Sequence, residues 1–165
     1  MTFVIRKIEI NKWMQTPILQ GQSPSADAIT NCMKTTNNTL SLWDIQDENE
    51  VEDAVLAIAS QLDHLDTFDI LVIEKSLIQE KALSLKSTEG KTPYKDFSNR
   101  HIDVANLDLD SLGRMAKVII ESIRQNRQKR FTTSNLKRIL ADGIIQGKIQ
   151  KTDIKENLLR KLPNQ

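Results

Sequence analysis

The chain has one cysteine, Cys32, in 165 residues, so it can form no intramolecular disulfide and no multi-cysteine zinc site. Five glycines and four prolines leave little material for long flexible linkers. No apolar run approaches the roughly 18 residues of a membrane-spanning helix, and no basic leader precedes an apolar stretch of signal-peptide length. These absences favour a reducing compartment, and we expect a cytoplasmic protein with no membrane partner.

Motifs of the common nucleotide-binding and hydrolase designs are also missing. The sequence has no Gly-x-Gly-x-x-Gly, no complete Gly-x4-Gly-Lys-Ser/Thr phosphate loop and no Gly-x-Ser-x-Gly. Cys32 falls on the apolar face of a predicted helix, where a buried, inert thiol is the usual outcome. The sequence therefore predicts no cofactor and no metal site, and it favours a binding protein over an enzyme.

The net charge of +1 combines two parts of opposite sign. Residues 1–112 carry 10 Lys/Arg and 18 Asp/Glu, which gives −8, whereas residues 113–165 carry 13 and 4, which gives +9. A basic C-terminal third either binds a polyanion or an acidic protein surface, or it folds back on the acidic part of its own chain.

Hydrophobic periodicity predicts an α/β or α+β fold: a small mixed sheet of about three to five strands flanked by helices. Strands are predicted over residues 3–10, 39–45 and 68–74. Helices are predicted over residues 24–36, 47–62 and 110–126, with Asp108 or Asp110 as the cap of the last. The order strand, helix, strand over residues 39–74 predicts a βαβ unit with parallel strands and a right-handed crossover.

Residues 124–130 contain no apolar side chain, and we place a boundary there. Residues 1–126 are predicted to form the α/β domain, and residues 127–165 a basic helical C-terminal extension. Within this extension one helix is predicted after Thr132 and a second after Thr152 or Asp153.

Two charged surfaces are candidate binding sites. The acidic one lies at the start of a predicted helix, where carboxylates complement the helix dipole and where complementary charge would attract a basic protein. Its residues are Asp44, Asp47, Glu48, Glu50, Glu52 and Asp53. The basic one offers the phosphate contacts that supply most non-specific affinity for nucleic acid. Its residues are Arg124, Arg127, Lys129, Arg130, Lys137 and Arg138.

Acidic runs elsewhere give weaker signals for metal chemistry. Residues 63–69 hold three aspartates and His64, but they lack the spacing and the central glycine of an EF-hand loop. Asp69 with Glu89 and Lys91 has the residue types of a metal-dependent nuclease, although Glu89 and Lys91 fall in a predicted turn. Both patterns are typical of polar turns.

His101 is the better of the two histidines as a catalytic candidate, because it lies near Asp103 in a predicted loop after Pro93. A histidine oriented by a carboxylate is the usual general base, whereas a surface or packed histidine is the commoner situation.

Three functional hypotheses remain. The first is a non-enzymatic protein-binding module, for instance the immunity, antitoxin or accessory component of a bacterial protein pair. The second is a nucleic-acid-binding protein that uses its basic C-terminal helices. The third is a small hydrolase or nuclease, with His101 as its base. The sequence leaves the partner and the oligomeric state open.

Overall fold

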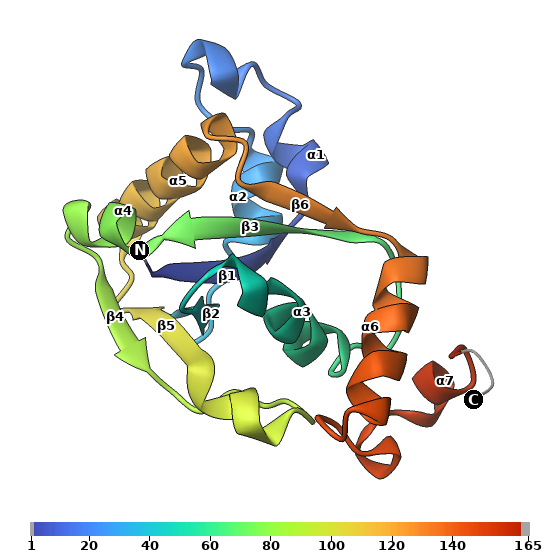
Figure 1. The fold of residues 1–165 in the computed structure, drawn as a ribbon. Coiled ribbons are helices and arrows are strands. Elements are labelled where there is room, and N and C mark those ends of the chain that lie inside the picture. The colour runs from blue at the N-terminus through green and yellow to red at the C-terminus, as the bar shows by residue number, and fades with distance from the viewer. Residues whose placement is uncertain (1, 163–165) are drawn as a thin grey trace.

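The computed structural model describes residues 2–162 and contains one six-stranded sheet with helices on both faces (Figure 1). The strands are β1 (Phe3–Ile8), β2 (Leu40–Ile45), β3 (Phe68–Glu74), β4 (Ser84–Ser87), β5 (His101–Ala105) and β6 (Gln128–Phe131). Their order across the sheet is β4, β5, β2, β1, β3, β6, and each neighbouring pair is antiparallel.

The predicted fold class is confirmed as α+β, with one difference in the sheet. The strands near 39–45 and 68–74 run in the same direction, as predicted, but β1 lies between them and pairs with both. Val4 and Ile5 of β1 point to opposite faces and both have no exposed surface, so this strand needs a neighbour on each edge and cover on each face. The predicted βαβ unit is therefore split by β1, and the sheet is antiparallel rather than mixed.

Most helix positions follow the predicted pattern. The α-helices are α1 (Ile10–Trp13), α2 (Ala26–Cys32), α3 (Val51–Ala59), α4 (Lys75–Glu80), α5 (Leu109–Arg124), α6 (Thr133–Ile145) and α7 (Glu156–Leu159). The 3₁₀ helices are η1 (Ile18–Gln20), η2 (Glu48–Glu50), η3 (Lys95–Arg100) and η4 (Lys151–Asp153). Asp108 and Thr132 cap α5 and α6 as predicted, each in a reciprocal capping box.

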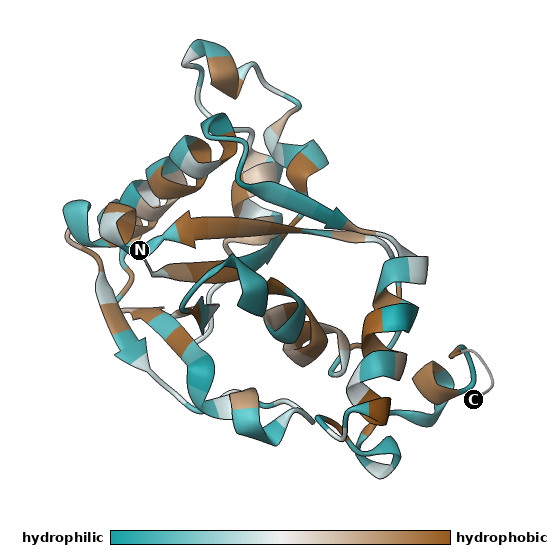
Figure 2. Cartoon of the chain, in the orientation of Figure 1, coloured by the Kyte–Doolittle hydropathy of each residue, from teal (hydrophilic) through white to brown (hydrophobic). Residues whose placement is uncertain are grey.

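The sheet separates two hydrophobic clusters. The α3 face carries Phe3, Ile5, Ile70 and Val72 of the sheet and is covered by α3, η3, α6 and α7. The α5 face carries Val4, Leu42, Leu71 and Ile73 and is covered by α1, α2, α4 and α5. Figure 2 shows the contrast between the apolar central strands β1 and β3 and the hydrophilic edge strand β6.

Two strands lie where the sequence predicted other structure. Residues 101–105 were expected in a loop and form β5; the predicted helical extension of residues 127–165 begins with β6, the edge strand beside β3. The sequence of β6 resembles a linker because an edge strand needs few apolar side chains. Only Phe131 is apolar, and its ring contacts that of Phe68 on β3 in a tilted arrangement. Residues beyond 126 also share one core with residues before it, since Leu136 and Leu140 belong to the α3-face cluster.

No helix within residues 2–162 is long and apolar enough to cross a membrane.

Candidate functional site

The acidic and basic surfaces predicted from the sequence lie against each other at the rim of the α3 face. The basic side chains come from β6 and the residue before it, from α6 and from the residues that follow α6. The acidic ones come from η2, α3, the end of β3 and the α3–β3 connection. We call these contacts the charge seam: Arg127 with Glu48 (3.1 Å) and Glu74 (2.7 Å), Lys129 with Glu48 (2.7 Å), Arg138 with Glu52 (2.5 Å), Lys148 with Asp53 (2.6 Å) and Lys155 with Asp63 (2.5 Å). The basic third therefore folds back on the acidic part of its own chain.

Ionisation at the seam follows the pairing. The hydrogen bond from Lys129 lowers the pKa of Glu48, and the hydrogen bond from Lys155 lowers the pKa of Asp63. Glu52 raises the pKa of Arg138 through a hydrogen bond. Each effect favours the charged form of the group whose pKa it shifts.

The remaining residues of the two predicted surfaces have other contacts. Asp44 pairs with Lys75 (2.7 Å), and Glu50 pairs with Arg100 (3.2 Å). The Asp47 carboxylate accepts a hydrogen bond from the backbone amide of Asn49 in η2. Arg124 donates to the Ile18 carbonyl oxygen, and Arg130 pairs with Asp69. Lys137 makes no ion pair with any residue between 2 and 162.

The metal and nuclease patterns do not assemble. Within the described part of the chain, no group of three His, Cys, Asp or Glu side chains is placed to hold a metal ion. Asp69 lines a pocket at the end of β1, whereas Glu89 and Lys91 line a different pocket beside the end of α3. Arg130 also engages both oxygens of Asp69, at 2.8 and 3.1 Å.

His101 forms a polar network across β5 and the segment after β4. The Thr88 hydroxyl donates to Asp103 Oδ2 (2.8 Å) and lies 2.7 Å from His101 Nδ1, while the Ser41 hydroxyl donates to Asp103 Oδ1 (3.0 Å). Because a hydroxyl carries a single hydrogen, this network assigns the proton of neutral His101 to Nδ1 and leaves a lone pair on Nε2. Burial lowers the pKa of His101 against the opposing effect of Asp103, so the imidazole is neutral at pH 7.

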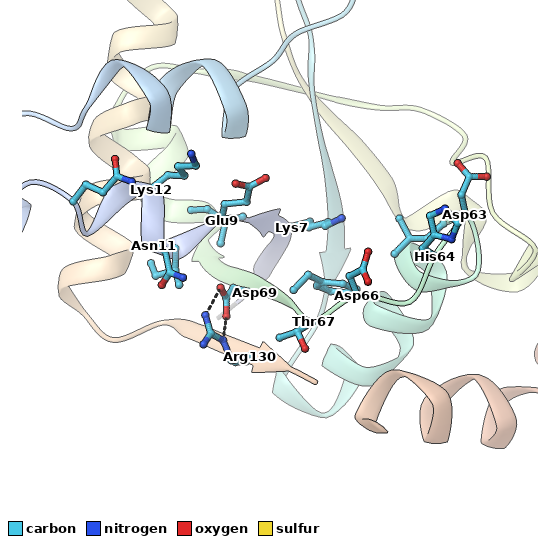
Figure 3. A pocket seen from close by; sticks show the side chains of 15 residues that line it. Lys7, Glu9, Asn11, Lys12, Asp63, His64, Asp66, Thr67, Asp69 and Arg130 are labelled. Atoms are coloured by element: carbon cyan, nitrogen blue, oxygen red, sulfur yellow. Dashed lines mark hydrogen bonds and ion pairs between the residues drawn. The ribbon is translucent and has the colours of Figure 1, made fainter. Parts of the chain in front are cut away.

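A pocket of about 730 Å³ opens where β1 ends (Figure 3). We call it the strand-end pocket. Its lining comes from the end of β1, from α1, from the α3–β3 connection, from the start of β3 and from Arg130 of β6. Among its charged side chains, Asp69 with Arg130 and Asp63 with Lys155 are paired. Lys7, Glu9, Lys12 and Asp66 have no ion-pair partner among residues 2–162.

The connection between α1 and α2 is a second exposed feature. We call residues 14–25 the uncharged loop, because they contain no acidic, basic or histidine residue in a chain that is 27% charged. In Figure 1 the loop projects beyond α2 and the end of α5. Two large apolar side chains of the loop are exposed, Met14 by 46% and Leu19 by 57%.

The uncharged loop is held in place by hydrogen bonds and by one buried anchor. Arg124 of α5 donates to the Ile18 carbonyl oxygen through Nε (3.0 Å) and Nη2 (2.6 Å), and the Ile18 side chain has no exposed surface. The Thr16 hydroxyl donates to the Ser23 carbonyl oxygen across the loop (3.1 Å). Leu19 is thus presented on a fixed backbone.

Neither the strand-end pocket nor the uncharged loop was predicted from the sequence. The loop had a readable signal, since twelve residues without a charge contain three large apolar side chains and two prolines. The pocket had none, because its lining residues come from three separate parts of the chain.

Comparison with protein-family models, with curated proteins and with solved structures gave no significant match.

Proposed function

We propose that this protein is a non-enzymatic protein-binding module that holds its partner through the uncharged loop. The observation that carries the proposal is the pair Met14 and Leu19, exposed on a loop that Arg124 fixes to the body of the molecule. An immunity, antitoxin or accessory role in a bacterial protein pair is the form of this function that we expect for a chain of this size.

A fixed apolar loop suits protein recognition for energetic reasons. Burial of a Leu or Met side chain contributes about 1.5–3 kcal/mol, and a loop that is ordered before binding loses little conformational entropy when the complex forms. Isolated exposed apolar residues are ordinary, and Leu109 is such a residue with 88% exposure. Met14 and Leu19 differ from it because they share one uncharged segment.

The charges around the loop define the partner further. Beside residues 21–24, a hollow of about 580 Å³ is lined by Lys81, Lys117 and Arg124 against one carboxylate, Glu121. We therefore propose a protein partner with an apolar groove for Leu19 and an acidic rim that faces these cations.

The test measures capture of proteins by the tagged chain at low salt, with and without nuclease treatment, followed by titration of the purified partner. Leu19→Asp is expected to weaken binding at least about tenfold, which corresponds to the loss of one buried apolar anchor. Leu109→Asp is the matched control, since it places the same charge on a more exposed leucine at the first position of α5. Equal binding by both variants would refute the loop as the site. Nuclease-sensitive capture would favour the nucleic-acid hypothesis.

A small hydrolase is the second candidate, favoured by the lone pair on Nε2 of His101. Asp103 and Thr88 orient this imidazole as a carboxylate orients the base of a catalytic triad, with the threonine hydroxyl as an added bridge. Esterase and phosphatase assays on the wild type and on His101→Gln test the idea. Activity that His101→Gln abolishes while the fold is retained would replace the binding-module proposal.

A further inference from the structure

The strand-end pocket is formed by fixed parts of the fold. β1, β3 and β6 are paired side by side at its inner wall, and Asp69 within it is only 7% exposed. Arg130 holds Asp69 in a two-point contact (2.8 and 3.1 Å), which Figure 3 shows with dashed lines. The volume of about 730 Å³ lies within the range of small-molecule sites. The wall is therefore preorganised for a ligand.

Charges of both signs line the pocket without neutralising one another. Lys7 and Lys12 have no carboxylate partner, and Glu9 and Asp66 have no cationic partner, among the residues that the structure describes. At the charge seam, by contrast, the opposite charges are paired. The four side chains at the pocket therefore retain their capacity to bind charged groups of a ligand.

An apolar surface lies beside these charges. Phe68 lines the pocket and is 6% exposed, and Leu62 and Ile10 line it as well. The Lys7 ammonium lies 5.2 Å from the centre of the Phe68 ring, a cation–π contact that fixes the position of the cation. A ligand in the pocket therefore meets an apolar surface, a fixed cation and carboxylates together.

We propose that the strand-end pocket binds a short peptide segment that carries one cationic and one anionic side chain next to an apolar residue. A purely anionic ligand would meet Glu9 and Asp66, and a purely cationic one would meet Lys7 and Lys12, so like-charge repulsion disfavours both. A ligand with both charges satisfies both pairs. The segment is either a free peptide or part of a protein partner, and the two sources share this chemistry.

The probe is the blocked tripeptide acetyl-Lys-Leu-Glu-amide, titrated into the isotope-labelled full chain and followed by backbone amide NMR. We expect saturable shifts at residues 7–12 and 66–69. The blocked peptides Lys-Leu-Lys and Glu-Leu-Glu test the need for both charges, and we expect each to bind at least about tenfold more weakly. Lys7→Met, which retains an unbranched apolar chain over Phe68, and Asp66→Asn are expected to weaken the mixed peptide about tenfold. Lys86→Met on β4 lies outside the pocket and is expected to leave binding unchanged.

The outcomes separate this proposal from the proposed function. Absence of shifts, or equal binding of the three peptides, overturns the pocket proposal and leaves the loop test intact. Peptide binding that the variants abolish supports the proposal. If Lys7→Met and Asp66→Asn also weaken capture of the protein partner, the segment belongs to that partner; if capture is unchanged, the ligand is a free peptide.

Discussion

Two groups of basic side chains, one on each face of the sheet, make different contacts. On the α3 face the cations of the charge seam meet carboxylates, as in Lys129 with Glu48 and Lys148 with Asp53. On the α5 face, Arg6 and Arg124 donate to backbone carbonyl oxygens. The first kind of contact is screened by salt and lost when a carboxylate is protonated, whereas the second has no titratable acceptor. The difference indicates which of these two groups of contacts should respond to solution conditions.

Replacement of Arg6 is expected to give the largest effect. Arg6 donates to the carbonyl oxygens of Cys32 (2.9 and 2.5 Å) and Ser41 (2.7 Å), and Arg6→Met would leave both acceptors without this donor. Burial lowers the pKa of Arg6 to about 10, so the cost of desolvating the guanidinium offsets part of the gain. We expect the free energy of unfolding in urea to fall by about 2–4 kcal/mol.

Arg138→Met is the control on the α3 face, because the Arg138 side chain is half exposed in its pair with Glu52. We expect a change of at most about 1 kcal/mol. Equal losses for the two variants would show that the two kinds of contact do not differ in strength.

Substitution of two glycines, one in a helix on each face of the sheet, allows the packing on the two faces to be compared. A Cβ added at Gly143 of α6 would lie 2.8 Å from Leu56 Cδ2 of α3, whereas one added at Gly113 of α5 meets nothing within 4 Å. Gly143→Ala is expected to lower the free energy of unfolding by about 1–3 kcal/mol through overpacking. Gly113→Ala is expected to raise it by about 0.5–1 kcal/mol through helix propensity. Thermal unfolding of both variants measures the contrast, and stabilisation of both would mean that α6 lies farther from α3.

Salt should weaken the ion pairs of the charge seam. Between about 0.1 M and 1 M salt the Debye length falls from about 10 Å to about 3 Å, which screens exposed pairs. The difference in unfolding free energy between wild type and the triple variant Arg127→Gln, Lys129→Gln, Arg138→Gln is expected to shrink by about 1 kcal/mol over this range. The corresponding difference for Arg6→Met is expected to stay constant, and a parallel decrease would contradict the comparison.

Lowering the pH is expected to change the free energy of unfolding least, and the direction of each pKa shift determines whether stability rises or falls. The pKa of Glu48 is lowered from its ordinary 4.5, so its stabilising contribution is complete above that pH and is lost as the pH falls through the lowered value. The pKa of His101 is lowered from 6.5, so the unfolded chain takes up this proton first and stability declines as the pH falls below 6.5. Glu48→Gln should remove the first dependence and His101→Gln the second, as measured by urea unfolding at several pH values.

Elements with a strong local pattern were predictable. The apolar run Ile70–Ile73 predicted β3. The apolar stripe of α5 and its Asp108 cap predicted both ends of that helix to within two residues. β5 was missed because its alternation of Ile102 and Val104 with polar residues is short and lies among turn residues. β6 was missed because cations occupy most of it.

The candidate sites were less predictable because they depend on contacts between distant residues. The separation is 79 residues for Arg127 with Glu48 and 95 for Lys148 with Asp53. The charge imbalance between the two parts of the sequence allowed self-pairing as one of two outcomes, but it gave no means to choose between them. The choice depends on β6 joining the sheet, and that pairing has no local signal.

The position of β1 between β2 and β3 has a consequence for folding during synthesis. β1 leaves the ribosome before either of its neighbours, and β6, which covers the outer edge of β3, leaves it last of all the strands. Until residues 128–131 emerge, β3 has an open edge with four consecutive apolar residues. We expect nascent chains that end before β6 to be the aggregation-prone and chaperone-dependent species of this protein.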